Sequence, residues 1–292
     1  MNVLSEIIHE ALNHQGGYAS VDGNGDVTRF IEVAPAGVRY LSLNDVMTPK
    51  SGSQFTLSGS LAINSLVVRA GAEVIRIQPV EQSPAGASIT LKQLEGKFVT
   101  VESANFSVVP DGVEVTDSIA PYLVAAYDST TAPCYGVAFN LTRKQLKHEF
   151  VDDTIMRAVN TAIELGISNL ADFVLLNHLE AEAQTMNDVT FKGLAKVAAA
   201  RGLRWDELRA LAGGECTGLE VDGTGILRAF GVRAELSKNT SKTIIGAFSR
   251  TAIGIDDEIR IIAKREKNGS VQVVVWVNAQ ALVPDNTAFW KA

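Results

Sequence analysis

Hydrophobic and polar positions alternate along two stretches in the first third of the chain, which predicts β-strands. The stretches are residues 72–78, AEVIRIQ, and residues 87–94, ASITLKQL. The segment between them, PVEQSPAG, has the two prolines and the glycine of a loop tip. We therefore predict a two-stranded ribbon here, within a strand-rich region over 53–116. Because such a ribbon is marginal in water, either its own domain or a second copy of the chain must cover it.

A second pattern, with apolar residues three and four positions apart, predicts helices. The longest covers 152–183, about 50 Å if unbroken, although Gly166 and Ser168 are positions where it can kink. Its expected apolar face consists of Ile155, Val159, Ile163, Gly166, Leu170, Phe173 and Leu176. A shorter helix in LTRKQLKHEF is expected to be capped by Asn140 or Thr142. Further helices are expected at 3–14 and, as a pair broken at Gly202, within 188–214.

The end of the chain predicts a β-hairpin. Residues 258–267, EIRIIAKREK, and 270–279, SVQVVVWVNA, flank Asn268 and Gly269. This dipeptide is typical of a type I′ turn, in which both central residues have positive φ. The run from Val273 to Val277 is apolar on both faces, which indicates a central strand.

Composition narrows the classes of function. The chain has 292 residues, of which 46% are hydrophobic and 20% charged, as in ordinary globular proteins. It carries 26 Lys and Arg against 33 Asp and Glu, a formal charge of −7, and no cluster of basic residues stands out in the sequence. Binding to a phosphate backbone is therefore not expected. Such an acidic protein can still enclose nucleic acid without adhering to it.

The cysteine count and the apolar runs indicate where in the cell the protein is expected. Cys134 and Cys216 are the only cysteines, too few for a disulfide framework. The first residues do not resemble a signal peptide, and no apolar run is expected to span a membrane. We expect a soluble protein that stays where it is made.

Candidate catalytic and metal sites are weak. Asp22, Asn24 and Asp26 begin like a calcium loop, but Val27 and Val33 stand where that loop needs Gly and Glu. The His-Glu pairs lack the second histidine of a zinc-protease helix. The acidic run 256–258 is expected to be solvated charge. No catalytic, cofactor-binding or metal-binding residue is predicted.

Three stretches resemble the major capsid proteins of tailed bacteriophages, which share the Hong Kong 97-type shell fold. Residues 136–179 are similar to that family's strand, short helix and spine helix, with an acidic residue, Asp172, before an apolar end. Residues 226–264 resemble its strands around a Gly-x-Phe-Ser segment, here Gly246 to Ser249. Residues 277–292 resemble its closing strand, with a proline and the pair Ala288-Phe289. One departure is Asn177-His178, where the family often has Gly-Asp or Gly-Asn.

The resemblance implies an α+β fold with five parts. These are an N-terminal arm (1–50), strands and an extended loop (51–115), a peripheral domain with the spine helix (116–186), an axial domain (187–270), and a closing strand returning to the peripheral domain (271–292). The ribbon, within 66–103, would be the extended loop that lies over a neighbouring subunit. The residues then expected to take part in assembly are Pro79, Val80, Glu81, Gln82, Ser83, Pro84, Lys92 and Lys97.

The resemblance also implies a function. The chain would be a non-enzymatic subunit that self-assembles, as hexamers and pentamers, into an icosahedral shell around a tailed phage's double-stranded DNA. It would reside in the virion after synthesis in the host bacterial cytoplasm. Implied partners are copies of itself, a separate scaffolding protein if any, and portal and decoration or cement proteins, with no cofactor and no membrane. One alternative is an encapsulin-type compartment holding an enzyme cargo. Another is an enzyme using Cys216 with His178 as its base.

Overall fold

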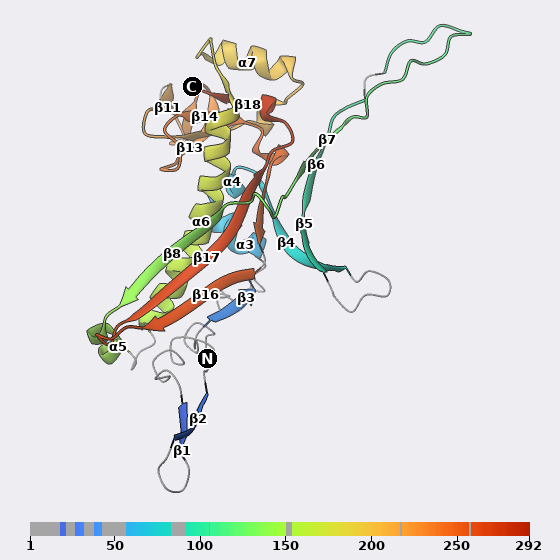
Figure 1. Cartoon of the computed structure of the whole chain (residues 1–292). Coiled ribbons are helices and arrows are strands. Elements are labelled where there is room, and N and C mark those ends of the chain that lie inside the picture. The colour runs from blue at the N-terminus through green and yellow to red at the C-terminus, as the bar shows by residue number, and fades with distance from the viewer. Residues whose placement is uncertain are drawn as a thin grey trace. The chain divides into compact units, whose positions relative to one another are not determined.

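The computed structural model describes residues 18–21, 27–31, 38–42, 57–82, 91–104, 106–149, 154–216, 218–256 and 258–292 (Figure 1). The expected helix at 3–14 and the turn at 22–26 lie outside these ranges. Helices and sheets are mixed along the chain, so the α+β class is confirmed. The chain divides into two compact units, one of residues 1–64, 133–170 and 255–279, and one of residues 65–132, 171–254 and 280–292. The five-part division expected from the resemblance stays a prediction.

The first unit contains an antiparallel set of strands centred on β17 (Val271–Leu282), which pairs with β16 (Glu258–Arg265) and β8 (Cys134–Leu141). β3 (Val38–Ser42) pairs with the other edge of β16. Along β17 buried residues alternate with half-buried ones, and Val273, Val275 and Val277 are at most 5% exposed. The predicted central strand is therefore confirmed. The unit also holds α3 (Leu57–Asn64) and the β1–β2 pair (Tyr18–Val21 with Val27–Ile31).

The predicted hairpin between β16 and β17 is confirmed, but the predicted type I′ turn is wrong. The amide of Gly269 donates to the carbonyl of Glu266, 2.9 Å away, and Gly269 has φ +81°. Asn268 has no positive φ; its Oδ1 accepts from the Ser270 amide at 2.9 Å. This is a type I turn followed by a left-handed glycine, a longer hairpin connection than the two-residue type I′ turn.

Two helices follow β8. α5 (Arg143–Glu149) is preceded by Thr142, which forms the predicted cap. The Gln145 amide donates to Thr142 Oγ1 at 3.3 Å, and the Thr142 amide donates to Gln145 Oε1 at 2.9 Å. This reciprocal pair is a capping box. α6 (Thr154–Glu182) is the predicted long helix and continues through Gly166. Its buried face differs in part from the predicted one, because Val174 and Leu175 are buried while Phe173 is 39% exposed.

Most of α6 is more apolar than expected. By length and composition, residues 157–182 could cross a membrane, and their most apolar stretch has a mean hydropathy of 1.3. However, 56% of the most apolar stretch is buried within the protein, as in the core helix of a soluble fold.

The second unit contains a sheet of seven strands among the described residues, in the order β11-β12-β13-β10-β14-β18-β9. The strands are β9 (Gln184–Thr185), β10 (Arg209–Ala212), β11 (Leu219–Val221), β12 (Leu227–Ala229), β13 (Val232–Leu236), β14 (Thr243–Gly246) and β18 (Phe289–Lys291). The pairs β10–β13 and β18–β9 are parallel and the others antiparallel. The chain's last strand thus lies inside this sheet.

Two secondary-structure predictions are wrong, one in the second unit and one at the junction of the two units along the chain. The first member of the pair expected in 188–214 is α7 (Phe191–Ala200), but the second is replaced by a 3-10 turn, Trp205–Glu207, and by β10. β10 is buried and pairs on both sides, so tertiary pairing outweighs its helix-favouring alanines and leucines. Strands expected from residue 53 are instead α3 and the short helix α4 (Leu66–Arg69).

The second unit also carries two pairs of strands at the region predicted to form the ribbon. β4 (Glu73–Gln82) pairs with β5 (Leu91–Glu95), and β6 (Lys97–Val101) pairs with β7 (Tyr122–Ala126), both antiparallel. A buried cluster at the base of both pairs consists of Ile77, Phe98, Tyr127, Ala252 and Leu282. Gly96 packs against this cluster, where an added Cβ would lie 2.2 Å from Ile77 Cδ1 and would displace the end of that side chain.

Candidate functional site

The β4–β5 pair contains most of the residues predicted to take part in assembly. Pro79 lies opposite Leu94, and Glu81 lies opposite Lys92. Val80 and Gln82 complete that end of β4, while Ser83 and Pro84 lie outside the described residues. Lys97 is exposed at the start of β6. The predicted ribbon is present as a strand pair, but its predicted bounds are wrong in part: Pro79 to Gln82, expected in the loop tip, are paired residues of β4. Residues 83–90 lie outside the described ranges, and the role of the ribbon in assembly stays a prediction.

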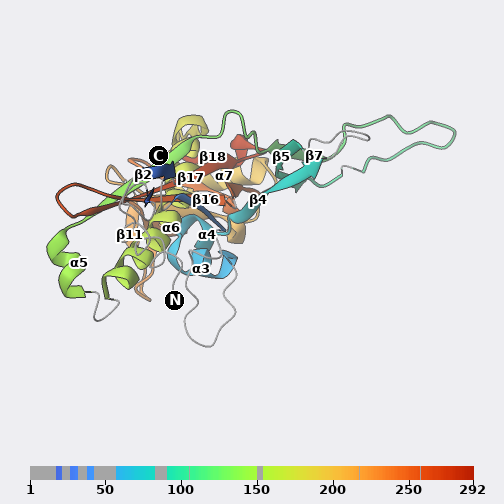
Figure 2. The ribbon, with the colours of Figure 1, turned by 60° about the horizontal axis from the view of Figure 1, so that its bottom comes forward.

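A second projection, formed by residues 102–121, was not distinguished in the sequence. We call these residues the arm. It leaves the end of β6 and returns to β7, and both views show it as a long narrow loop continuing that strand pair (Figures 1 and 2). The Glu102 amide donates to the carbonyl of Pro121 at 2.8 Å, which closes its base. A turn at the far end joins the Val113 amide to the Pro110 carbonyl at 3.1 Å, with Gly112 at φ +77°.

The described side chains of the arm are all exposed, including large apolar ones. Phe106 is 98% exposed, Val108 96% and Ile119 95%. The sequence alternates there as a strand would, but between residues 102 and 121 the described residues form no strand. The expected strand in this range is therefore wrong. Alternation indicates one face that is to be covered, and nothing within the described chain covers it.

The arm is also uniformly acidic. It contains Glu102, Asp111, Glu114 and Asp117 and no Lys, Arg or His. Its formal charge of −4 is more than half of the chain's total of −7. A surface that covers the arm must therefore accept carboxylates as well as apolar side chains.

Basic residues gather in the first unit, which corrects the expectation that no basic cluster exists. α5 carries Arg143, Lys144 and Lys147, and the β16–β17 hairpin carries Lys264, Arg265 and Lys267. We call these six residues the basic surface. They are separated by over 100 residues in sequence, but Leu141 at the end of β8 pairs with Val271 at the start of β17. This register brings α5 beside the hairpin turn.

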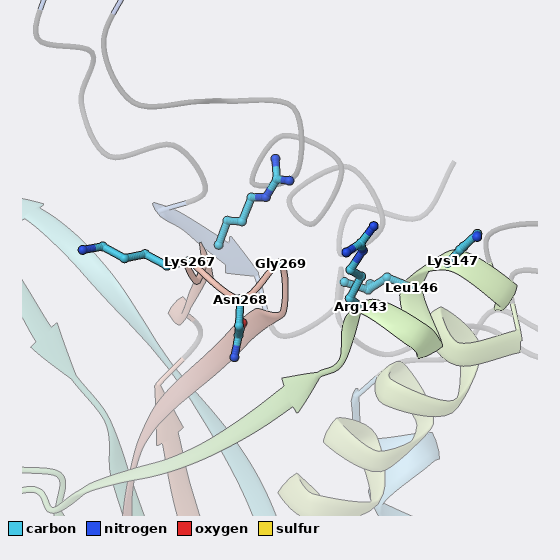
Figure 3. A pocket seen from close by; sticks show the side chains of 7 residues that line it. Arg143, Leu146, Lys147, Lys267, Asn268 and Gly269 are labelled. Carbon is cyan, nitrogen blue, oxygen red and sulfur yellow. The ribbon is translucent and has the colours of Figure 1, made fainter.

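A hollow of about 440 Å³ lies between α5 and the turn. It is lined by Arg143, Leu146, Lys147, Arg265, Lys267, Asn268 and Gly269 (Figure 3). Figure 3 shows Arg143 between the turn and the rest of α5, while Lys147 and Lys267 extend away from each other. The positive charge is therefore spread over a surface and does not converge on one point.

The candidate catalytic residues are not brought together. His178 Nε2 lies 3.2 Å from Asn286 Oδ1, and the amide of Cys216 donates to the carbonyl of Gly213. No hydrogen bond links Cys216 to His178, both of which the structure describes. Asp256, from the acidic run, is buried and accepts a hydrogen bond from Asn278 at 3.4 Å. Among the described residues there is no group of three or more His, Cys, Asp or Glu that could hold a metal ion.

Comparison with known proteins gives structural neighbours of low similarity. No protein-family model matches the chain, and no curated protein sequence matches it. A chain of the satellite phage P4 procapsid with its size determination protein is 14% identical, with a TM-score of 0.49, over 80% of this chain and 97% of that one. A chain of the mature capsid of bacteriophage PhiM1 is 9% identical, with a TM-score of 0.46, over 93% of this chain and 94% of that one. A chain of a virus-like particle from Pyrococcus furiosus is 11% identical, with a TM-score of 0.45, over 80% of this chain and 95% of that one.

Proposed function

We propose that the chain is the structural subunit of a closed protein shell, with the Hong Kong 97-type fold of a tailed-phage major capsid protein. The single observation that carries this proposal is the arm, whose apolar side chains are nearly fully exposed in the isolated chain. Burial of a large apolar side chain stabilises by roughly 1.5–3 kcal/mol. A chain that leaves Phe106, Val108 and Ile119 in water therefore gains substantially when another molecule covers them.

The order of elements supports the same proposal. Where the sequence resembles the family's strand, short helix and spine helix, the chain forms β8, α5 and α6. Where it resembles the family's Gly-x-Phe-Ser segment, β14 ends at Gly246 and a 3-10 turn, Phe248–Arg250, leads to β15 (Ala252–Asp256). Where it resembles the closing strand, β17 is followed by a 3-10 turn, Asn286–Ala288, and β18.

Finer features of the function follow from this proposal. Copies would assemble as hexamers and pentamers into an icosahedral shell around double-stranded DNA, located in the virion. Many weak contacts repeated over each subunit would hold such a shell together. A scaffolding protein, a portal and decoration or cement proteins would be its partners, and the subunit itself would perform no catalysis.

Expression of the full chain tests the proposal. Light scattering and negative-stain microscopy of the soluble protein are expected to show rings, tubes or closed shells tens of nanometres across. Nucleic acid inside the shells would support a capsid, and an enriched cellular enzyme would instead support a cargo compartment. A protein that remains monomeric at high concentration, and that a scaffolding partner also fails to assemble, would contradict the proposal.

A further inference from the structure

The arm and the basic surface carry opposite and equal formal charges. Residues 143–149 and 264–269 together hold six basic and two acidic side chains, a formal +4, against −4 for the arm. All six basic residues are exposed. The remainder of the chain is acidic, so the basic surface is a positive island on a negatively charged protein.

Several of these cations have no acidic partner within the described chain. Lys264 Nζ lies 3.5 Å from Glu266 Oε1. Arg143, Lys147 and Lys267 form no ion pair with a described residue. The arm's Asp111, Glu114 and Asp117 likewise form none. The charged side chains of the arm and of the basic surface are thus exposed and available to a partner.

We propose that the acidic arm of one copy docks on the basic surface of a second copy. This inference rests on the proposed function, because it names the partner of the arm within the shell. Asp111, Glu114 and Asp117 would face the cations around the hollow. Phe106 and Ile119 would cover the aliphatic stems of the lysine and arginine side chains, which present apolar surface beneath their charged ends.

The spacing of the charges favours a protein segment over a single small anion. Glu114 and Asp117 lie on the limb that returns from the turn to β7, and in an extended chain two carboxylates three residues apart are separated by about 10 Å. The cations are likewise spread, since Lys147 and Lys267 extend in opposite directions from the hollow (Figure 3). A segment with several spaced carboxylates can reach them all, whereas one phosphate cannot.

The same observations favour a second copy over nucleic acid. Nucleic acid bound at the basic surface would leave the arm's apolar side chains in water. A second copy instead supplies the complementary charge and covers those side chains. Opposite charges across such a contact also set its register and speed its formation.

Charge reversal in the full-length protein tests the docking. The arm variant is D111K/E114K/D117K, and the surface variant is R143E/K147E/K267E. Each is expected to raise the protein concentration needed for assembly at least about tenfold, measured by light scattering near 0.15 M salt, where screening still permits such contacts. A chain carrying both sets of reversals is expected to assemble at nearly the wild-type concentration.

A mixture of the two variants shows whether the contact joins different copies. The arm of the surface variant can dock on the basic surface of the arm variant, and the reverse pair is also opposite in charge. We therefore expect the 1:1 mixture to co-assemble although each variant alone does not. Restoration in the doubly reversed chain without co-assembly of the mixture would mean a contact within one chain and would overturn the proposal.

The controls separate this proposal from the proposed function. K192E/K196E/R201E changes by the same charge three exposed cations, two on α7 and one at its C-cap, and is expected to assemble like the wild type. Wild-type assembly that is unaffected by the arm and surface variants would overturn the docking and leave the shell intact. Loss of bound nucleic acid from normally assembling surface-variant shells would overturn it in favour of a polyanion site.

A measurement on oligomers applies even where no closed shell forms. Analytical ultracentrifugation is expected to show self-association of the wild type that weakens in each variant and returns in the mixture. A wild type that forms oligomers but no shells would contradict the proposed function alone. Equal association by wild type and variants would contradict the docking alone.

Discussion

Asp172 illustrates how a single side chain joins distant segments. It lies on α6, is 4% exposed, and accepts hydrogen bonds from Ser65 Oγ at 2.6 Å and from the Val67 amide at 3.0 Å. Ser65 in turn caps α4 by accepting from the Val68 amide at 3.3 Å. The carboxylate therefore satisfies the start of a helix in a segment where the valines alone would favour a strand.

The titration of Asp172 makes stability depend on pH. Burial raises the pKa of Asp172 above its ordinary value of 3.8, and hydrogen bonds from Ser65 and Val67 offset only part of this rise. Between 3.8 and the folded pKa the native state binds more protons than the unfolded state, so the free energy of unfolding falls as pH rises through that interval. Above the interval the penalty is constant.

Asp172→Asn is expected to abolish this fall, because the amide oxygen still accepts from Val67 but the group no longer ionises. Denaturant titrations at a series of pH values, from below the ordinary pKa of 3.8 up to neutral pH, measure the slope. Asp111→Asn, which removes an exposed carboxylate of the arm, is the matched control. An unchanged slope in Asp172→Asn would contradict the assignment.

Two glycines show how the same substitution has opposite effects at different places. A Cβ at Gly166, exposed on α6, would meet no atom within 4 Å. A Cβ at Gly246, on β14, would lie 2.3 Å from Phe289 Cδ1 and 2.6 Å from the Ala288 carbonyl oxygen. The first position permits alanine, and the second requires the backbone of β14 to approach β18 closely.

Gly166→Ala is expected to raise the free energy of unfolding by about 0.5–1 kcal/mol, because alanine loses less conformational entropy in a helix. Gly246→Ala is expected to lower it by about 1–3 kcal/mol, because Phe289 and the backbone must shift. Thermal and denaturant unfolding of the two variants measure both values. A stabilising Gly246→Ala would refute the packing of β18 on β14.

At the scale of elements, the two strand pairs project from one base. Ile77 precedes the part of β4 that pairs with β5, while Phe98 and Tyr127 lie at the start of β6 and just after β7. The buried cluster thus anchors both projections in the second unit. Their distal parts contribute no residue to that cluster.

Deletion of Pro79 to Gly86 is therefore expected to impair assembly while leaving the subunit folded. The deletion removes the end of β4 and the tip, but it spares Ile77 and the rest of the cluster. Circular dichroism melting tests folding, and light scattering tests assembly. Shells of normal size and yield from this variant would exclude the β4–β5 pair from the contacts between subunits.

At the scale of the whole molecule, exposed apolar surface and charge are distributed unevenly. The arm combines large apolar side chains with carboxylates, and the basic surface gathers cations from α5 and the β16–β17 hairpin. Such a distribution suits a protein that acts through contacts between copies.

Phe106→Ser together with Ile119→Ser is expected to leave the melting temperature unchanged, since both side chains are at least 95% exposed. The same variant is expected to raise the concentration needed for assembly at least tenfold, because burial of each side chain stabilises by roughly 1.5–3 kcal/mol. Val221→Ser, at a position 66% exposed on β11, is the control. Wild-type assembly by the double variant would exclude burial of the arm between copies.

The sequence alone was sufficient for the elements whose signals are local. The periodicity of α6, the Thr142 cap and the Asn268-Gly269 hairpin are each encoded within a few turns of chain. The ribbon was predicted as a strand pair, but β4 continues through Gln82, four residues into the predicted loop tip. Local patterns failed where distant partners decide the conformation. β10 is a strand because β13 and β14 pair with it, and residues 65–69 turn into α4 where Asp172, over 100 residues away, supports the Ser65 cap.

The basic surface and the arm were decided by tertiary structure alone. Arg143 and Lys267 become neighbours of one hollow only through the β8–β17 register, which no local pattern specifies. The alternation at 102–116 indicated a strand, but the folded chain provides no strand to pair with it. Sequence periodicity records which face of a segment is to be buried, whereas only the fold shows whether the chain itself supplies the cover or leaves that face to a partner.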